Sequence, residues 1–322
     1  MYRESREPNI VLDGEDITDA KVTESNMAMA FQNDALYPHV TARRNMAFGL
    51  KMTIDVSKAE RHARVDEVPE MMGIEELLGK KPNDLSGRQQ QRVAPGRAIV
   101  REPEVFLMDE PLSNLDAKLR TQMRTELQSL QQEFDVTTVY VTHDQTEAMT
   151  LGERVAVMND GRIQQVDPPR TLYDFPETRF VAEFVGSPAM NVFPVTVERT
   201  DGGWVATRGG FRCELPPGDG LEEGPFSMGI RPEDLGVVPD PGTAHVSAPV
   251  EVTEPQGDSL LLHAGFGDHT LLALTDSRAA VDVGDEVGVD FDTRRIHLFD
   301  PEDGRAVYHS ERAATRTMAD TV

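Results

Sequence analysis

The stretch Val105-Phe-Leu-Met-Asp-Glu-Pro-Leu-Ser-Asn-Leu-Asp116 is the clearest guide to the fold class of this 322-residue chain. Its four opening apolar residues are typical of a strand buried on both faces, and two carboxylates follow at once. Such strands belong to α/β sheets, where ligands collect at the carboxyl ends of the strands. Asp109 and Glu110 are therefore candidate functional residues, although a strand that runs into a polar turn has the same pattern.

Segments on both sides of this strand repeat the alternation of short apolar runs with helical patterns. In addition to the strand at 105–108, strands are expected at residues 27–31, 137–141 and 154–158. Helices are expected at residues 57–78, 88–101, 117–134 and 144–151. Residues 1–185 are therefore predicted to form an α/β domain.

A change of pattern after residue 185 marks a second predicted domain. Gly186-Ser-Pro188 interrupts the chain, and short alternating strands separated by Gly, Pro and Asp follow. The clearest of these strands are residues 250–253, 260–263, 270–274 and 286–291. Residues 186–310 are predicted to form a small all-β domain, and residues 311–322 a disordered tail without a core pattern.

The composition limits the class of protein. There are 56 acidic and 32 basic residues, so the net charge of −24 argues against nucleic acid or an anionic membrane surface as a partner. Only six residues are lysine and the acidic excess is spread along the chain, which favours a halophilic protein over an ordinary acidic one. The single cysteine, Cys213, excludes an internal disulfide, and no secretory signal or membrane-spanning run is found, so an intracellular location is expected.

Three further segments place polar groups where the predicted strands end or a predicted helix begins. Leu85-Ser-Gly-Arg-Gln89 precedes the helix expected at 88–101, where free backbone N–H groups attract anions. His143 ends one strand with an imidazole, and Gln32 ends another with an amide. Taken singly, each has an ordinary structural explanation, such as an N-capped surface helix or a structural histidine.

Taken together, these segments resemble the ATP-binding subunit of ABC transporters. The order and separations that carry the resemblance are those of Gln32, residues 85–89, 109–111 and 113–116, and His143. Residues 35–39, 45–50 and 96–101 are similar to the carbohydrate importers of maltose and glycerol-3-phosphate type. Met228-Gly-Ile-Arg-Pro-Glu233 is similar to the OB-like accessory domain of that branch, although by itself Arg231-Pro-Glu233 is interpreted as an exposed turn.

The resemblance implies a P-loop-type transport ATPase that uses ATP and Mg²⁺. It assigns Asp109 to the Mg²⁺ side of the site and Glu110 to the role of base that polarises the attacking water. Gln32 is expected to contact both the metal and the γ-phosphate. His143 is expected to hold the γ-phosphate and Glu110.

The resemblance also implies a site shared between two subunits. Ser86, Gly87 and Gln89 are expected to bind the γ-phosphate held by the opposite subunit, and Asp116 to lie in the loop that couples the two sites. The second subunit is either another copy of this chain or a full-length paralogue. Two membrane permease subunits and, through them, an extracellular solute-binding protein are the other implied partners. The chain is then peripheral, on the cytoplasmic face of the membrane.

One motif of the family is not found. The phosphate loop, Gly-x-x-x-x-Gly-Lys-[Ser/Thr], needs a lysine followed by a hydroxyl residue, and none of the six lysines is followed by one. The family places this loop upstream of the position of Gln32. We therefore expect an incomplete, N-terminally truncated ATPase domain that lacks its first strands and its phosphate loop, with impaired hydrolysis.

Three internal residues also depart from the expected pattern. Arg88 replaces the second glycine of Leu-Ser-Gly-Gly-Gln, and Pro69 and Pro95 fall within predicted helices, where a proline costs about 3 kcal/mol. Three interpretations stay open: an impaired transport ATPase, a non-catalytic regulatory or interaction subunit, and a truncated remnant that does not accumulate as folded protein.

Overall fold

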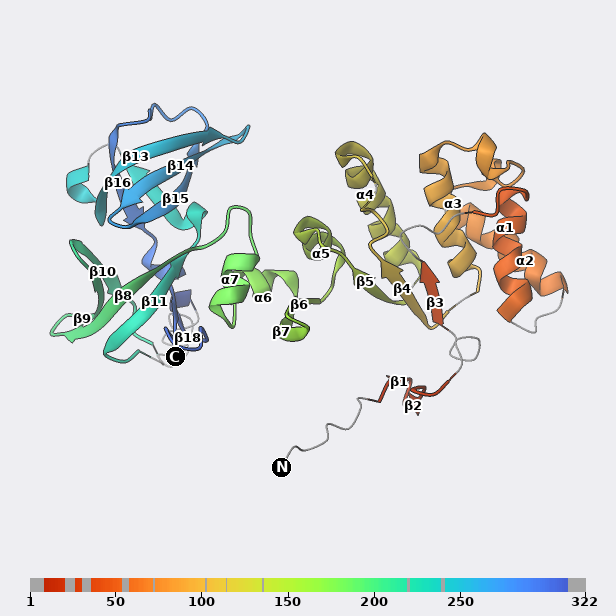
Figure 1. Ribbon diagram of the computed structural model, residues 1–322, viewed down its shortest axis with the longest axis horizontal. Coiled ribbons are helices and arrows are strands. Elements are labelled where there is room, and N and C mark those ends of the chain that lie inside the picture. The colour runs from red at the N-terminus through yellow and green to blue at the C-terminus, as the bar shows by residue number, and fades with distance from the viewer. Residues whose placement is uncertain are drawn as a thin grey trace, which may run out of the picture. The chain divides into compact units, whose positions relative to one another are not determined.

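The chain forms two compact units. The computed structural model describes residues 9–20, 27–30, 36–53, 58–71, 73–101, 103–113, 115–134, 136–218, 221–238 and 241–311. The first unit is Met1–Gly152 and the second is Glu153–Val322 (Figure 1). The domain boundary between residues 185 and 186 stays a prediction, and the disordered tail at 312–322 lies outside the described residues.

A three-stranded parallel sheet carries the candidate site of the first unit. Its strands are β3 (Met27–Ala30), β4 (Val105–Asp109) and β5 (Thr137–Val141), in the order β3-β4-β5 (Figure 1). Leu107 lies opposite Met29 on one side and Val139 on the other. Because all three strands are parallel, their carboxyl ends meet at one edge of the sheet. The α/β class predicted for this part of the chain is confirmed.

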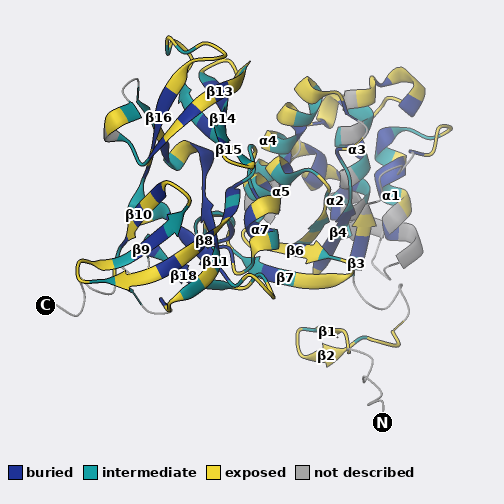
Figure 2. Cartoon of the chain, turned by 60° about the vertical axis from the view of Figure 1, so that its left-hand side comes forward, coloured by how far each residue is buried: buried dark blue, intermediate teal, exposed yellow. Residues whose placement is uncertain are grey.

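Helices pack against this sheet and against one another. They are α1 (Ala42–Thr53), α2 (Lys58–Met71), α3 (Gly87–Ile99), α4 (Ala117–Phe134) and α5 (Gln145–Leu151), with short 3-10 turns η1 (Glu75–Leu77) and η2 (Pro82–Asp84). Phe106 and Met108 of β4 share a buried cluster with Val93 of α3 and Leu127 of α4. A separate hairpin of β1 (Val11–Leu12) and β2 (Glu15–Asp16) is largely exposed (Figure 2).

The helix predicted at 57–78 is shorter than expected, and the prediction is wrong for residues 73–78. α2 ends at Met71, and Gly73 follows with a φ of 57°. The N–H of Gly73 donates to the carbonyl of Glu70 (3.1 Å) and the N–H of Ile74 to that of Pro69 (2.9 Å), which closes the helix at a glycine. Neither helix is broken at its proline, since α2 runs two residues past Pro69 and α3 runs through Pro95 to Ile99.

The second unit consists mostly of antiparallel strands, as predicted for the C-terminal part. One sheet has the order β10-β9-β8-β11-β17-β18, another the order β12-β16-β13-β14-β15, and β6 pairs with β7. The strands are β6 (Val155–Asn159), β7 (Arg162–Asp167), β8 (Asn191–Thr200), β9 (Gly203–Arg208), β10 (Phe211–Leu215), β11 (Gly224–Ile230), β12 (Leu235–Val238), β13 (Val246–Pro255), β14 (Ser259–Phe266), β15 (His269–Asp276), β16 (Glu286–Phe291), β17 (His297–Phe299) and β18 (Ala306–His309). The short helical segments are α6 (Pro169–Asp174), α7 (Arg179–Phe184), η3 (Pro232–Asp234), η4 (Pro241–Thr243) and η5 (Thr293–Arg295).

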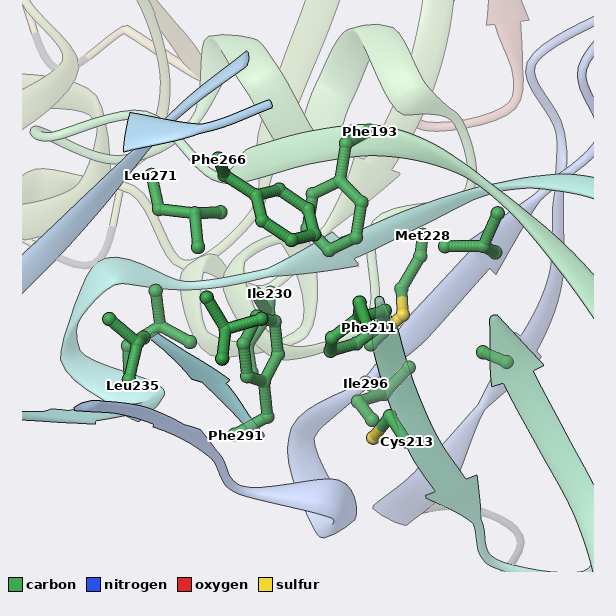
Figure 3. Close-up of a cluster of buried hydrophobic side chains, with 14 of the residues drawn as sticks. Phe193, Phe211, Cys213, Met228, Ile230, Leu235, Phe266, Leu271, Phe291 and Ile296 are labelled. Atoms are coloured by element: carbon green, nitrogen blue, oxygen red, sulfur yellow. The ribbon is translucent and has the colours of Figure 1, made fainter. Parts of the chain in front are cut away.

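Aromatic rings fill the core of the second unit. Phe193 of β8 and Phe266 of β14 have ring centroids 5.1 Å apart, and Phe211 of β10 and Phe291 of β16 are 4.9 Å apart (Figure 3). Edge-to-face and tilted pairs at such distances add to the free energy gained by burial. The four rings come from both large sheets, so this cluster holds those sheets together.

Arg231 is buried in the second unit, which corrects the interpretation of Arg231-Pro-Glu233 as an exposed turn. Only 2% of the residue is exposed. Its guanidinium donates to the backbone carbonyls of Tyr173 (2.9 Å), Ala182 (3.3 Å) and Val185, and it lies over the Tyr173 ring, 3.9 Å from the centroid. These three carbonyls, from the last turns of α6 and α7 and from the C-cap of α7, take the place of the water that an exposed arginine would bind.

Candidate functional site

Asp109 and Glu110 stand where β4 ends. Asp109 is the last residue of the strand, and Glu110 follows with a φ of 45°, in the left-handed region that non-glycine residues seldom adopt. The Glu110 N–H donates to the carbonyl of Val141 at the end of β5 (2.9 Å). Ser113 donates to the Glu110 carbonyl through its N–H (3.3 Å) and its hydroxyl (2.8 Å). These contacts hold the unusual backbone in place and aim the Glu110 side chain.

His143 meets Glu110 at this edge. Its Nε2 lies 3.1 Å from Oε1 of Glu110. The His143 side chain is 88% exposed and that of Glu110 is 28% exposed, so the pair lies open to ligands. A carboxylate within hydrogen-bond distance of an imidazole is an arrangement suited to moving or holding a proton. The structure thus brings together two residues that are 33 positions apart, because β4 and β5 are neighbouring parallel strands.

A buried carboxylate that the motifs do not reveal supports the β5–α5 loop, residues 142–144. Glu147 Oε2 accepts hydrogen bonds from the hydroxyls of Tyr140 and Thr142, each at 2.8 Å. Burial, and next the hydrogen bond to Glu147, raise the pKa of Tyr140. Asp144 caps α5 by accepting from the N–H groups of Thr146 (2.8 Å) and Glu147 (3.2 Å). The one sequence signal for Glu147 is its position three residues after this cap, the spacing of a capping box.

Ser86 and Gln89 form a capping box at the start of α3. The Gln89 N–H donates to the Ser86 hydroxyl (3.3 Å), and the Ser86 N–H donates to Oε1 of Gln89 (3.0 Å). Among the described residues, no atom would lie within 4 Å of a Cβ at Gly87, the first residue of α3. The prediction that a helix begins here is confirmed. The capping box accounts for Ser86 and Gln89 locally, so their predicted contact with a phosphate stays a prediction.

The remaining predicted residues lie in two places. Asp116 caps α4, since its Oδ1 accepts from the N–H of Leu119 (3.0 Å). Gln32, predicted to contact the metal and the γ-phosphate, lies outside the described residues. Nothing is described of the Arg88 side chain either. The structure therefore groups Asp109, Glu110 and His143, and places Asp116 on the loop that continues from Glu110.

The carboxylates at this edge suit one side of a Mg²⁺-nucleotide site. Mg²⁺ is usually held by one or two carboxylates, with waters and substrate phosphates completing its octahedral shell. Across the described ranges, no group of three or more His, Cys, Asp or Glu side chains is arranged to hold a metal ion. Asp109 thus suits a metal that arrives with its nucleotide.

Comparisons with known proteins agree with this arrangement. Residues 2–113 match the model of the ABC transporter family, residues 186–235 the MalK OB fold domain and residues 228–299 the TOBE domain. The chain therefore belongs to the ATP-binding proteins of the ABC transporter family, whose members use ATP with Mg²⁺. Its C-terminal part carries the OB and TOBE modules that were predicted as an OB-like accessory domain.

Three relatives illustrate the similarity. The xylose/arabinose import ATP-binding protein XacK of Haloferax volcanii is 49% identical over 302 residues, which cover 91% of this chain and 78% of that protein. The trehalose/maltose import ATP-binding protein MalK of Thermococcus litoralis is 49% identical, with coverage of 88% and 78%. The sn-glycerol-3-phosphate import ATP-binding protein UgpC of Ruegeria is 45% identical, with coverage of 90% and 81%.

Proposed function

We propose that this chain is the ATP-binding subunit that energises the import of a carbohydrate or a related solute through an ABC transporter. The observation that carries the proposal is the contact between Glu110 and His143 at the carboxyl ends of β4 and β5. Relatives at 45–49% identity are named for the import of xylose/arabinose, trehalose/maltose and glycerol-3-phosphate. The solute of this chain belongs, in this proposal, to the same chemical range.

In this proposal the side chains at the sheet edge divide the work of hydrolysis. Bound Mg²⁺ neutralises charge on the phosphates during their transfer. The proposal assigns Asp109 and Gln32 to the Mg²⁺ side of the nucleotide site. Glu110 accepts a proton from the attacking water, and His143 holds the Glu110 carboxylate and the γ-phosphate in position. Support for these roles comes from the 3.1 Å distance between His143 and Glu110 and from the backbone contacts that fix Glu110.

The proposal extends to a second subunit. Ser86, Gly87 and Gln89 contact the γ-phosphate bound by the partner, which is a second copy or a full-length paralogue, and Asp116 couples the two sites. The position of Gly87 at the start of α3 supports this role, because the positive end of a helix dipole favours an anion.

The proposed membrane partners are two permease subunits, which link the chain to an extracellular solute-binding protein. An exposed aromatic pair supports the permease contact: the rings of Tyr37 and Phe48 are 4.7 Å apart, and the Arg97 guanidinium lies 5.0 Å from the Tyr37 ring. Exposed aromatic and arginine side chains of this kind are enriched at protein interfaces. Among the described helices, none is long and apolar enough to cross a bilayer. The similarity to import ATP-binding proteins leads us to propose a peripheral position on the cytoplasmic face of the membrane.

A second candidate function is a non-catalytic regulatory or interaction subunit. The observation that favours it is that residues 1–322 contain no Gly-x-x-x-x-Gly-Lys-[Ser/Thr] motif. The backbone and lysine of that motif hold the phosphates in P-loop ATPases. A subunit of this kind would bind the permease or an intact paralogue without turning over ATP.

The test measures Mg-ATP binding and hydrolysis by the purified chain in molar KCl, alone and mixed with a full-length paralogue. The high salt suits a chain with a net charge of −24. Glu110→Gln is expected to keep ATP binding and to lower turnover by about a hundredfold or more, the usual effect of removing a general base. The matched control is Glu126→Gln, which removes a carboxylate in the middle of α4 that is 3.1 Å from Arg92 of α3. The control should keep its turnover.

The outcomes separate the candidates. Turnover that Glu110→Gln abolishes and Glu126→Gln retains supports the ATPase. Folded protein that neither binds nor hydrolyses Mg-ATP, alone or mixed, contradicts the ATPase and supports the non-catalytic subunit if it still binds the paralogue. Aggregated protein in gel filtration would support the remnant.

A further inference from the structure

We propose that Arg120 and Glu147 are positioning residues that join the two loops of the candidate site and hold His143 beside Glu110. The β4–α4 loop comprises residues 110–116, and the β5–α5 loop, residues 142–144, carries His143. The inference rests on the proposed function and adds two residues to it. We call the two side chains the Arg120–Glu147 strut.

The Glu147 end of the strut is anchored to β5 and α5. Its side chain is only 3% exposed, and the hydroxyl groups that donate to Oε2 belong to Tyr140 of β5 and to Thr142, which directly follows β5. Its own N–H donates to Asp144, which directly follows His143. A buried carboxylate needs such partners, because an unpaired one is costly. A displacement of Glu147 is therefore transmitted to the residues on either side of His143.

The Arg120 end of the strut contacts both loops with one guanidinium. Its Nη2 donates to the carbonyl of Leu115 (3.1 Å) and lies 3.5 Å from that of Ser113, both on the β4–α4 loop. Its Nη1 lies 3.6 Å from Oδ2 of Asp144, and its Nε lies 3.8 Å from Oε1 of Glu147. The guanidinium is a rigid planar fork, so these contacts move together. Arg120 thus ties the loop after Glu110 to the loop that carries His143.

The contact between Arg120 and Glu147 is an ion pair without a hydrogen bond. Arg120 Nε is buried and, in the part of the chain that the structure describes, has no hydrogen-bond partner. A separation of 3.8 Å is within ion-pair range but longer than a hydrogen bond. A small approach of α5 to α4 would satisfy this donor. The length of this contact therefore depends on how closely α5 approaches α4.

The alternative is that Glu147 supports only the start of α5. That local role predicts effects confined to α5 and the end of β5. The strut predicts effects on both helices, because Arg120 belongs to α4 and also contacts the loop that precedes α4. Amide groups at the two caps report on the difference: Thr146 and Glu147 donate to Asp144, whereas Leu119 and Arg120 donate to Asp116.

The experiment measures amide hydrogen exchange of the full chain without nucleotide, in Glu147→Gln and in the milder Tyr140→Phe, which removes one hydroxyl donor and no charge. Glu147→Gln is expected to speed exchange about tenfold at Thr146 and also at Leu119 and Arg120, the effect of losing one charged contact. Tyr140→Phe is expected to give the same pattern with a smaller change. Glu126→Gln, the control on α4, should leave both caps unchanged.

A spectroscopic and a kinetic measurement test whether the strut serves His143. Glu147→Gln is expected to shift the ring ¹⁵N resonances of His143, whereas Glu126→Gln is not. In protein that hydrolyses ATP, Glu147→Gln should lower kcat and leave KM for ATP unchanged, since neither residue is assigned to nucleotide binding.

Several results would overturn the inference. Exchange changes confined to α5, or no change at either cap, would reduce Glu147 to a local support. Unchanged turnover in Glu147→Gln, when Glu110→Gln abolishes it, would remove the positioning role. The exchange and ¹⁵N results do not require ATP binding, so the failure of the strut and the failure of the proposed ATPase are distinguishable.

Discussion

The His143–Glu110 pair in the first unit and Arg231 in the second unit place their charges in opposite environments. In the first unit His143 and Glu110 meet at an open sheet edge, with His143 88% exposed. In the second unit Arg231 is enclosed and donates to three backbone carbonyls. Exposed charged groups contribute little to stability and remain available to a ligand, whereas buried ones hold elements in place and are costly to lose. The comparison predicts which substitutions affect folding and which affect chemistry.

The largest effect on stability is expected for Arg231→Ala. The truncation leaves the carbonyls of Tyr173, Ala182 and Val185 without their donor and opens a cavity, so the second unit should lose about 3–5 kcal/mol. The loss of stability is measured by urea unfolding, which is monitored through the fluorescence of Trp204, the only tryptophan. Arg294→Ala is the control, because that side chain is 77% exposed and a surface ion pair such as the one it forms with Asp292 contributes little to stability. Equal losses of stability in Arg231→Ala and Arg294→Ala would contradict the predicted difference between buried and exposed charges.

A smaller effect is expected for Gly186→Ala, next to Arg231. Gly186 has a φ of 122°, and a Cβ would lie 2.6 Å from Arg231 Nη1 and 3.2 Å from the Pro188 carbonyl oxygen. Backbone strain and this contact together should cost about 2–3 kcal/mol in the same unfolding measurement. Gly257→Ala separates the cost of backbone strain from that of the steric contact, since Gly257 has a φ of 90° but no described atom within 4 Å of a Cβ. A loss of stability of about 1 kcal/mol is expected for this variant. A loss no greater than that of Gly257→Ala would show that the Arg231 enclosure can adjust.

A pH-dependent effect is expected for Asp234→Asn. Burial, and next the charge of Glu233, raise the pKa of Asp234 from 3.8 to about 6. Between about pH 4 and pH 6 the folded state keeps a proton that the unfolded state has lost, so this group lowers stability as pH rises through that window. The free energy of unfolding of Asp234→Asn should not fall in this way. Between pH 4 and pH 6 it should come to exceed that of wild type by about 1 kcal/mol, after allowance for the half-exposed side chain.

Unfolding of both proteins at several pH values, again followed by Trp204, measures this difference. Glu222→Gln, which removes one exposed carboxylate, is the control for net charge. A difference between Asp234→Asn and wild type that does not grow with pH would show that Asp234 is solvated in the folded protein.

The smallest effect on stability is expected for His143→Ala in the first unit. The side chain is almost fully exposed, so the free energy of unfolding should change by less than about 0.5 kcal/mol. Far-UV circular dichroism during urea unfolding follows the helices of this unit. Any loss of ATP turnover in this variant is then attributable to the site. A loss of more than about 1 kcal/mol would instead show that His143 stabilises the fold, as Arg231 is expected to do in the second unit.

Local structure could be predicted well where it depends on near neighbours. The helix Ala117–Phe134 and the strands Thr137–Val141 and Glu286–Phe291 have the bounds that the apolar periods indicate. The helix at 57–78 was overestimated because apolar residues continue past Met71, whereas the left-handed Gly73 ends it. A period shows where a helix is favourable, and a single backbone conformation can still end it.

The candidate site could be predicted only in part. Asp109, Glu110 and His143 follow apolar strands, and their positions at the strand ends are visible as a pattern. Glu147 has no such signal beyond its capping spacing, since its burial depends on Tyr140, Thr142 and Arg120 converging on one carboxylate. A carboxylate on a short helix is more often exposed, and the sequence provides no reason to expect otherwise.

The order of strands and helices, the two kinds of domain and the residue types at each strand end follow from the amino-acid sequence, because periodicity and spacing are local properties. The contact of His143 with Glu110, the bridge from Arg120 to both loops and the enclosure of Arg231 follow only from the folded chain. Each joins residues far apart in sequence, such as Arg231 and Val185, which are 46 positions apart. Which distant groups meet depends on how the strands pair. It also depends on which carbonyls and charges become buried, because a buried polar group needs a hydrogen-bond partner.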